Sequence, residues 1–261
     1  MTTFTISPKG LTRALLALAF WLGVWQLGAA AADVWMEGRG NELMLPYPSS
    51  VFRVLLALAG TGEFWMSVLA SLRRVLAGLA LGTGLGLALA ALTCVSPLAD
   101  CLFSPAVRVV RAAPVASFIL LVQLWARRSE VPAVISALMV LPVVWGGVSQ
   151  GIRETDGQLL ELARAYRFSR WKTVRLIYLP SVRPYLLSSV TTAMGLAWKS
   201  GVAAEVLCLP RTSIGTRIYY TKYNLEVPEL FAWTLAVVAL SLLLEGLLAR
   251  GLKRRSRGGA A

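Results

Sequence analysis

Long runs without a charged residue are the feature that most constrains how this chain can fold. Residues 14–32 and 75–99 contain no Asp, Glu, Lys or Arg. As an α-helix, about 20 such residues cross a hydrocarbon layer of about 30 Å. The whole chain is 57% hydrophobic and only 15% charged, which is too apolar for a soluble domain of 261 residues. We therefore predict an all-α integral membrane protein.

The apolar runs predict six transmembrane helices in one domain, 1–261, with no separate soluble domain. For the first run the competing interpretation is a cleaved signal peptide, because residues 29–32 resemble a signal-peptidase site. The run exceeds the usual apolar core of a signal peptide, which favours a retained helix. Between the first two spans, residues 33–62 predict an external loop with an interfacial helix over 51–59. The expected spans are about 12–33, 66–93, 106–126, 131–152, 183–208 and 228–250, and the third is interrupted by Arg111 and Pro114.

The distribution of Lys and Arg predicts the orientation in the membrane. An even number of spans places both termini on one side, and the positive-inside rule places the most basic loop in the cytoplasm. Arg127 and Arg128 then fall outside, which is a modest violation. The net charge of +13 is explained by cytoplasmic loops near anionic lipid, and nucleic-acid binding is not expected. The basic residues placed inside are Arg153, Arg164, Arg167, Arg170, Lys172, Arg175, Arg183, Lys253, Arg254 and Arg255.

Several classes of enzyme are excluded by what the sequence lacks. There is no histidine, so Ser–His–Asp and Cys–His sites and histidine-ligated metals are excluded. No Gly-x-x-x-x-Gly-Lys-Ser/Thr phosphate loop is present, so this chain is not expected to hydrolyse ATP. Acids within the spans are limited essentially to Glu205 and Glu245, too few for paired acid–base chemistry. We predict no catalytic residue, no metal site and no cofactor in this chain.

Three ionisable residues in the predicted spans are candidates for the lining of a pathway: Arg111, Lys199 and Glu205. An arginine facing lipid at mid-bilayer costs about 2.5–3.5 kcal/mol, so Arg111 is expected to face a cavity or to snorkel to the interface. For Lys199 the alternatives are snorkelling or pairing with an acid, such as Glu205, of another helix or subunit. Lys199 and Arg111 together would favour small anions.

Three glycines in the second span predict close helix packing. Gly78, Gly82 and Gly86 are spaced four residues apart and so share one face of a helix. Such a stripe of small residues lets a neighbouring backbone approach closely in lipid.

A basic amphipathic segment over 155–180 is set between the apolar runs, and its periodicity predicts two short helices with a break near Phe168 and Ser169. Ser169 is expected to cap the second helix, and Pro180 to end it. Basicity alone leaves two roles open, a loop lying on anionic lipid and a docking element for a soluble partner.

Spacing within this segment resembles a known coupling motif. Glu161-Leu162-Ala163, Ser169-Arg170-Trp171 and Ile177-x-Leu179-Pro180 are similar to the Glu-Ala-Ala…Gly…Ile-x-Leu-Pro motif of bacterial ABC importer permeases. The motif glycine, which lets the chain turn, is Arg167 here, and the second alanine is Leu162. Because arginine is strained in a left-handed turn, we expect a bend of different form, or one shifted to Phe168.

Further stretches in the same order resemble the nitrate/sulfonate/taurine class of type I, binding-protein-dependent permeases. They are Leu45-Pro46-x-Pro48-Ser49, Gly62-Glu63-Phe64-Trp65, Ser71 to Gly78, Arg111-Ala112-x-Pro114, and Ala197-Trp198…Val202-x-Ala204-Glu205.

The resemblance implies a type I ABC importer permease-like fold in the bacterial inner membrane. Two such chains, identical or closely related, would enclose a pathway for a small anionic or organic solute. A cytosolic ABC ATPase dimer would bind ATP and Mg²⁺, and an extracytoplasmic solute-binding protein would deliver the solute. A channel or secondary transporter that needs no ATPase is the alternative. The residues that the resemblance assigns to ATPase coupling are Glu161, Leu162, Ala163, Arg167, Ser169, Arg170, Ile177, Leu179 and Pro180.

Overall fold

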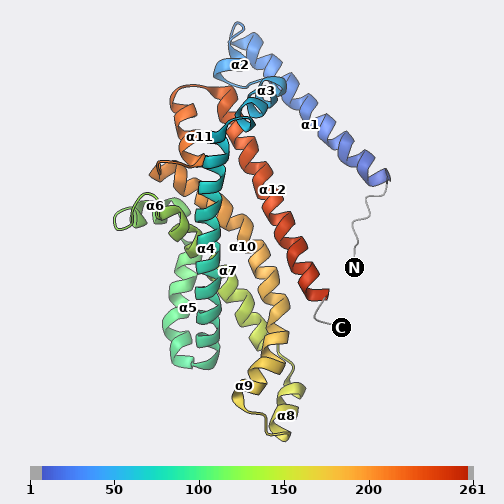
Figure 1. Ribbon diagram of the computed structural model, residues 1–261, viewed down its shortest axis with the longest axis vertical. Helices are drawn as coiled ribbons and strands as arrows, with labels where there is room; N and C mark the ends of the chain where they lie inside the picture. Colours follow the sequence, from blue (N-terminus) through green and yellow to red (C-terminus); the bar gives the residue numbers. More distant parts are fainter. Residues whose placement is uncertain (1–7, 258–261) are drawn as a thin grey trace. The chain divides into compact units, whose positions relative to one another are not determined.

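The computed structural model describes residues 8–257, and this part of the chain is helical and contains no strand (Figure 1). In chain order the helices are α1 (Pro8–Trp35), α2 (Gly40–Leu43), α3 (Pro48–Ala59), α4 (Gly62–Val95), α5 (Pro97–Ala112), α6 (Val115–Val122), α7 (Val131–Arg153), α8 (Gly157–Ala165), α9 (Arg170–Thr173), the π-helix η1 (Val174–Tyr178), α10 (Leu179–Cys208), α11 (Ile214–Tyr223) and α12 (Val227–Arg257).

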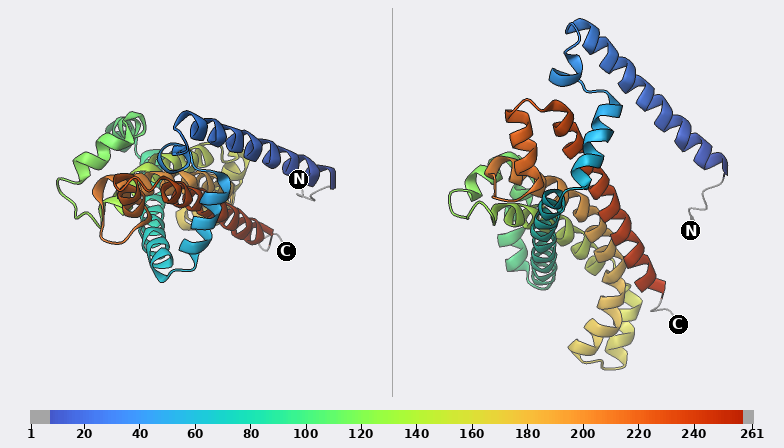
Figure 2. Two further views of the ribbon diagram at one scale, coloured as in Figure 1. Left: turned by 90° about the horizontal axis from the view of Figure 1, so that it is seen from above. Right: turned by 45° about the horizontal axis from the view of Figure 1, so that its top comes forward.

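The chain divides into two compact units. Unit 1 contains residues up to 65 and residues 217–237, and unit 2 contains residues 66–216 and those from 238 onward. In unit 1, α2 and α3 follow the C-terminal end of α1 (Figure 2). Aromatic contacts join its segments, with Trp25 beside Phe231 and Phe64 stacked on Trp233 at a centroid distance of 5.0 Å.

Polar bonds hold the turn between α1 and α3. The Asp33 carboxylate accepts from the backbone N–H of Asn41 and from the Tyr47 hydroxyl. Trp25 donates its indole N–H to the Pro46 carbonyl at 3.0 Å. The predicted apolar helix at 51–59 begins three residues earlier, at Pro48. Proline suits the first turn of a helix, because the backbone N–H that it lacks would have no partner within the helix there.

Helix α4 packs against α7 in unit 2 through the three glycines. A Cβ atom added to Gly82 would lie 2.5 Å from the Ala137 carbonyl oxygen, and one on Gly86 would lie 3.0 Å from that of Leu141. At Gly78 the obstruction is the backbone carbonyl of Ala133. The two backbones therefore approach more closely than any larger residue would allow.

The stretch predicted as one helix over 106–126 is two helices. α5 ends at Ala112 and α6 starts at Val115, and the two are bent by 107°. Ala113 is extended (φ −76°, ψ 144°) because the ring of Pro114 disfavours helical geometry in the preceding residue. The predicted span is thus interrupted at Pro114, and the bent pair of helices could still form one broken span.

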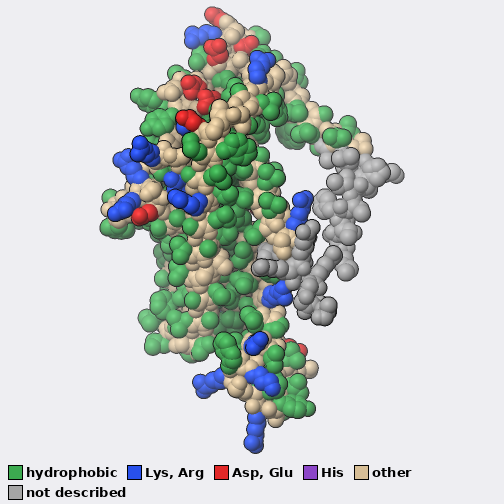
Figure 3. Space-filling model, viewed as in Figure 1, with side chains coloured by type: hydrophobic (Ala, Val, Ile, Leu, Met, Phe, Trp, Pro, Cys, Tyr) green, Lys and Arg blue, Asp and Glu red, His purple; other side chains and the backbone are tan. Residues whose placement is uncertain are grey.

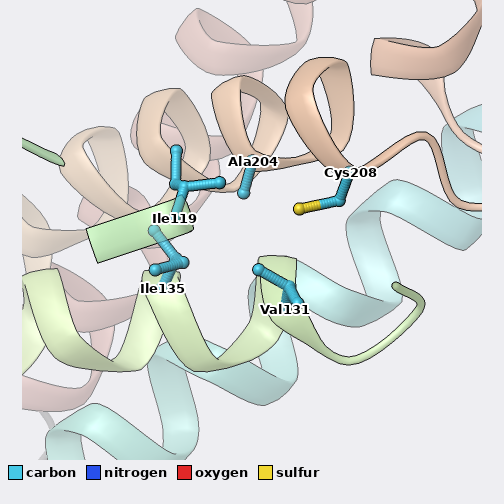
Figure 4. Close-up of a cluster of buried hydrophobic side chains, with 5 residues drawn as sticks. All are labelled: Ile119, Val131, Ile135, Ala204 and Cys208. Carbon is cyan, nitrogen blue, oxygen red and sulfur yellow. The ribbon is translucent and has the colours of Figure 1, made fainter. Parts of the chain in front are cut away.

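Helix α10 is 30 residues long and packs against α6 and α7. A buried cluster joins the three helices, with Ile119 from α6, Val131 and Ile135 from α7, and Ala204 and Cys208 from α10 (Figure 4). The Ser136 hydroxyl adds a bond of 3.0 Å to the Ala197 carbonyl. Cys208 of this cluster is buried as a free thiol, whereas Cys101 of α5 is exposed.

Four helices within residues 8–257 are both long and apolar enough to cross a membrane, namely α1, α4, α7 and α12, and the bent α5–α6 pair could count as a fifth. α10 overlaps the expected span 183–208 and has the length, but it carries Arg183, Lys199 and Glu205 and does not reach the same hydropathy. The chain is an all-helical, multi-pass membrane protein, and the full set of six spans is not confirmed.

The glycine contacts predict opposite effects for two neighbouring substitutions. Gly82→Ala should destabilise unit 2 by about 1–3 kcal/mol, because the new methyl group meets backbone that cannot move freely. Gly84→Ala is the matched control on the same helix. It has no heavy atom within 4 Å of the added Cβ and should be neutral or stabilising by up to about 1 kcal/mol. Thermal unfolding in detergent measures both, and equal unfolding midpoints would contradict the close packing.

Candidate functional site

The predicted coupling segment forms a helix–turn–helix, α8 and α9, in unit 2 (Figure 1). Asp156 is the N-cap of α8, because its carboxylate accepts from the backbone N–H of Gln158 at 2.9 Å. The helix ends at Ala165, and Tyr166 is its C-cap. Two paired bonds close the turn, from the Phe168 N–H to the Ala163 carbonyl at 2.8 Å and from the Arg167 N–H to the Arg164 carbonyl at 3.0 Å. This pattern is the Schellman motif, in which the residue after the C-cap is left-handed.

Arg167 is that left-handed residue, with φ +49°. The bend therefore stays where the motif glycine is expected, and of the two alternatives the shift to Phe168 is not found. The two turn bonds hold the arginine in a conformation that costs an L-residue about 1–2 kcal/mol.

Ser169 caps α9 as predicted, its hydroxyl accepting from the Lys172 amide at 3.3 Å. Pro180 does not end this helix, contrary to the prediction. α9, η1 and α10 follow one another without a gap, and Pro180 lies in the first turn of α10. The Leu179 N–H bonds to the Val174 carbonyl, five residues back, so the turn just before the proline is widened. A wide turn of this kind accommodates a ring that would clash with a normal helical carbonyl.

Most residues of the predicted motif are exposed, on α8, on α9, in the turn between them or at the start of α10. Ala163 of α8 and Ile177 of η1 are buried, at 3% and 7% exposure. A hollow of about 350 Å³ lies between α8 and α9, lined by Leu160, Ala163, Phe168, Arg170, Thr173 and Val174. The Lys172 ammonium lies 4.1 Å from the centre of the Phe168 ring. The motif residues on the surface are Glu161, Leu162, Arg167, Ser169, Arg170, Leu179 and Pro180.

Basic side chains gather on this helix–turn–helix, at one end of unit 2, whereas hydrophobic side chains cover the visible face of its long helices (Figure 3). The exposed apolar residues of the segment include Leu162 and Trp171, at 52% and 76% exposure. Exposed apolar groups mixed with charge are typical of a surface that binds another protein.

Glu205, predicted to line a pathway, is fully buried in unit 2. Arg74 of α4 forms an ion pair with one carboxylate oxygen at 3.1 Å, and Ser71 donates to the other at 2.7 Å. The Arg74 guanidinium also donates to the Thr212 carbonyl at 2.8 Å. Glu205 is therefore shielded from solutes in this structure and joins α4 to α10.

The same group of polar side chains holds the start of α11. The Ile214 amide donates to the Ser71 hydroxyl at 3.0 Å, and the Gly215 amide donates to the Glu205 carboxylate at 3.3 Å. Ser213 caps the helix by accepting from the Thr216 amide. A carboxylate placed at free N–H groups of a helix start is electrostatically favourable.

Lys199 and Arg111 lie apart from this network. Lys199 is exposed on α10, and Arg111 is exposed in the last turn of α5, where a cation interacts well with the helix dipole. Neither residue belongs to the ion pairs that the described residues form, Arg74–Glu205 and Arg217–Glu63. Pairing of Lys199 with Glu205 is therefore not found within the chain.

Sequence reasoning missed Arg74 and Ser71 as partners of Glu205. They lie 131 and 134 residues away in the chain. The sequence contained one signal for this pairing. Arg74 is a charged residue one turn before the glycine stripe, and charges near a span need partners.

Comparison with protein families identifies the chain's relatives. Residues 82–257 match the family of binding-protein-dependent transport system inner membrane components. The chain belongs to this family. Its match covers α7, the helix–turn–helix and α10, so the segment that carries the coupling motif lies inside the family domain.

Individual relatives are transport permeases and not enzymes. The chain is 24% identical to the taurine transport system permease protein TauC of Escherichia coli, over 95% of this chain and 89% of that protein. It is 27% identical to the bicarbonate transport system permease protein CmpB of Synechococcus elongatus, over 88% and 85%. SsuC of Bacillus subtilis, provisionally named an aliphatic sulfonates transport permease protein, is 28% identical over 76% and 69%.

A solved structure supports the fold. The crystal structure of an amino acid ABC transporter with histidines contains a chain that superposes with a TM-score of 0.60, covering 75% of this chain and 92% of that one. Sequence identity is 15%, so the likeness concerns the fold alone.

The buried ion pair gives a prediction for stability. Arg74→Ala should destabilise the protein by about 3–5 kcal/mol, because it leaves the Glu205 carboxylate buried without a cation. Adding Glu205→Gln to that variant should restore part of the loss, since the buried charge is then gone. Arg73→Ala, an exposed neighbour, is the control and should change little. Thermal unfolding in detergent is the measurement, and equal effects at residues 73 and 74 would contradict the pairing.

Proposed function

We propose that the chain is the permease subunit of an ATP-driven importer of small anionic solutes, coupled to a cytosolic ATPase through α8 and α9. The observation that carries the proposal is the exposed helix–turn–helix, which presents the coupling-motif residues and continues directly into α10. Two permease chains, identical or closely related, would enclose the pathway. ATP and Mg²⁺ would be bound by the ATPase dimer and not by this chain.

The position of the helix–turn–helix suits the transfer of movement. α9, η1 and α10 form an unbroken helical rod, so a push on α9 by the ATPase would be transmitted along α10. Glu161 is exposed on α8 and would make a polar contact with the ATPase, while the small Ala163 lets the two coupling helices pack closely. Arg170 and Lys172 would add electrostatic attraction.

This arrangement requires α8 and α9 to face the cytoplasm. The positive-inside rule supports that orientation, because the segment carries a high density of Lys and Arg. Both termini would then be cytoplasmic, in a bacterial inner membrane, and the turn held by Asp33 and Tyr47 would lie outside, where a solute-binding protein would dock.

Anions are the proposed solutes for two reasons. Relatives are named for taurine, bicarbonate and aliphatic sulfonates, which carry oxyanion groups. Lys199, exposed on α10, and Arg111, exposed at the end of α5, would give the pathway a positive potential.

The coupling role predicts separable effects of two substitutions in the same helix–turn–helix. Glu161→Arg should release the ATPase during co-purification and abolish stimulation of ATP hydrolysis by the solute-loaded binding protein, because the charge at the contact is reversed. Arg167→Gly should keep both and should raise the unfolding midpoint, since glycine relieves the left-handed strain of about 1–2 kcal/mol.

The control for the charge reversal is Glu42→Arg, an exposed residue of α2 outside the coupling segment, which should retain the ATPase. If the wild-type protein transports solute in vesicles without ATP, or if Glu161→Arg retains normal coupling, the proposal of an ATP-driven importer fails.

The proposed anion selectivity rests on Lys199. Lys199→Ala should lower uptake of anionic solutes about tenfold, while Lys199→Arg, which keeps the charge, should retain most of it. Uptake of taurine, bicarbonate and a neutral solute into vesicles that contain the complete importer measures this. Unchanged transport of every solute would contradict a role for Lys199.

A further inference from the structure

A polar cavity of about 420 Å³ lies between α5 and α7 in unit 2, apart from the coupling segment and from Lys199. Helix α5 contributes Asp100, Ser104 and Arg108, and the facing part of α7 contributes Trp145, Ser149, Gln150 and Arg153, followed by Glu154. Arg108, Gln150, Arg153 and Glu154 are exposed, whereas Ser104 and Ser149 are buried. Polar side chains in a membrane protein pair with one another, line a water-filled space or bind a ligand.

Both carboxylates in this cavity accept hydrogen bonds from within the protein. The Asp100 carboxylate accepts from the Ser104 hydroxyl, and Glu154 accepts from the Gln150 amide and the Tyr185 hydroxyl. The bond from Tyr185, followed by that from Gln150, holds the pKa of Glu154 below its ordinary value, so this carboxylate remains ionised and bonded near neutral pH. The Trp145 indole N–H is also used, donating to Thr93 at 3.0 Å.

The other hydrogen-bond donors of the cavity, by contrast, have no partner among the described residues. Arg108 and Arg153 belong to neither ion pair found among the described residues, although both carboxylates line the same cavity. The Ser149 hydroxyl is 7% exposed and its oxygen has no hydrogen-bond partner in the structure. Two guanidinium groups, each with five N–H donors, and a buried hydroxyl therefore line this cavity without a partner among the described residues.

We propose that this cavity binds an oxyanion, held by Arg108 and Arg153 and by the Ser149 hydroxyl. A guanidinium matches a carboxylate, sulfonate or phosphate group with paired hydrogen bonds, and a buried hydroxyl supplies a further donor. The bound group is either a soluble oxyanion or the phosphate of an anionic lipid headgroup, and both present the same chemistry. The inference does not require ATP-driven import.

The test uses the purified full-length protein in nanodiscs of neutral phosphatidylcholine. Sodium sulfate is titrated by calorimetry against sodium chloride at equal ionic strength. If the oxyanion is soluble, sulfate binds saturably, and Arg108→Gln and Arg153→Gln each weaken binding about tenfold or more, because each removes hydrogen bonds to a charge. Ser149→Ala weakens it severalfold. Arg175→Gln, an exposed arginine outside the cavity, is the matched control and leaves binding unchanged.

A second arm identifies a lipid source. Protein extracted from membranes that contain phosphatidylglycerol is examined by native mass spectrometry. Phosphatidylglycerol that stays on the wild type and the Arg175→Gln variant, and is lost from Arg108→Gln and Arg153→Gln, assigns the site to a headgroup. Unfolding midpoints of all variants without ligand verify that they are folded. The proposal is overturned if no sulfate binds and phosphatidylglycerol is retained equally by all four proteins.

Discussion

Close backbone contact among α4, α7 and α10 is the constraint on which the rest of unit 2 depends. The glycines of α4 place its backbone against α7, and Gly201 of α10 lies where an added Cβ would be 2.6 Å from Val75 and 2.7 Å from the Ser136 hydroxyl. Three helices therefore meet at positions where only glycine fits. In a membrane this packing matters more than the burial of apolar groups, since lipid is as apolar as leucine.

That proximity makes the buried charge pair possible. Arg74 lies one turn before Gly78 on α4, and Glu205 lies one turn after Gly201 on α10, so the contact through glycine brings the two charges within 3.1 Å. Removing either partner would leave the other charge buried and unpaired, which is destabilising. The ion pair therefore helps to fix the position of α4 relative to α10. The start of α11 is held by the same carboxylate, so the packing, the ion pair and the loop after α10 depend on one another.

Periodicity and spacing predicted much of this fold, and the failures have physical causes. Three features were predicted because they depend on residues that are close together in the sequence. They are the glycine stripe, the two short helices and the Ser169 cap. The interruption at Pro114 was predicted, but the 107° bend was not, because apolar composition says nothing about the direction of the chain after a proline interrupts a helix. Pro180 was misjudged because a π-turn, which lets a helix continue, has no simple sequence signature. The partner of Glu205 and the cavity between α5 and α7 depend on contacts between distant segments.

Arg167 illustrates how a turn can keep its form after losing its preferred residue. Its left-handed conformation recurs at Glu37 and Leu225, which also follow helix ends closed by a bond from the next residue's N–H to a carbonyl five positions back. In each case the paired turn bonds offset a strain of about 1–2 kcal/mol, so glycine is favoured there but not required. At Arg167 the long side chain is exposed beside the Phe168–Lys172 contact and adds positive charge at the tip of the helix–turn–helix. The geometry of the coupling segment is thus set by backbone hydrogen bonds, and the residue at its turn is free to contribute charge.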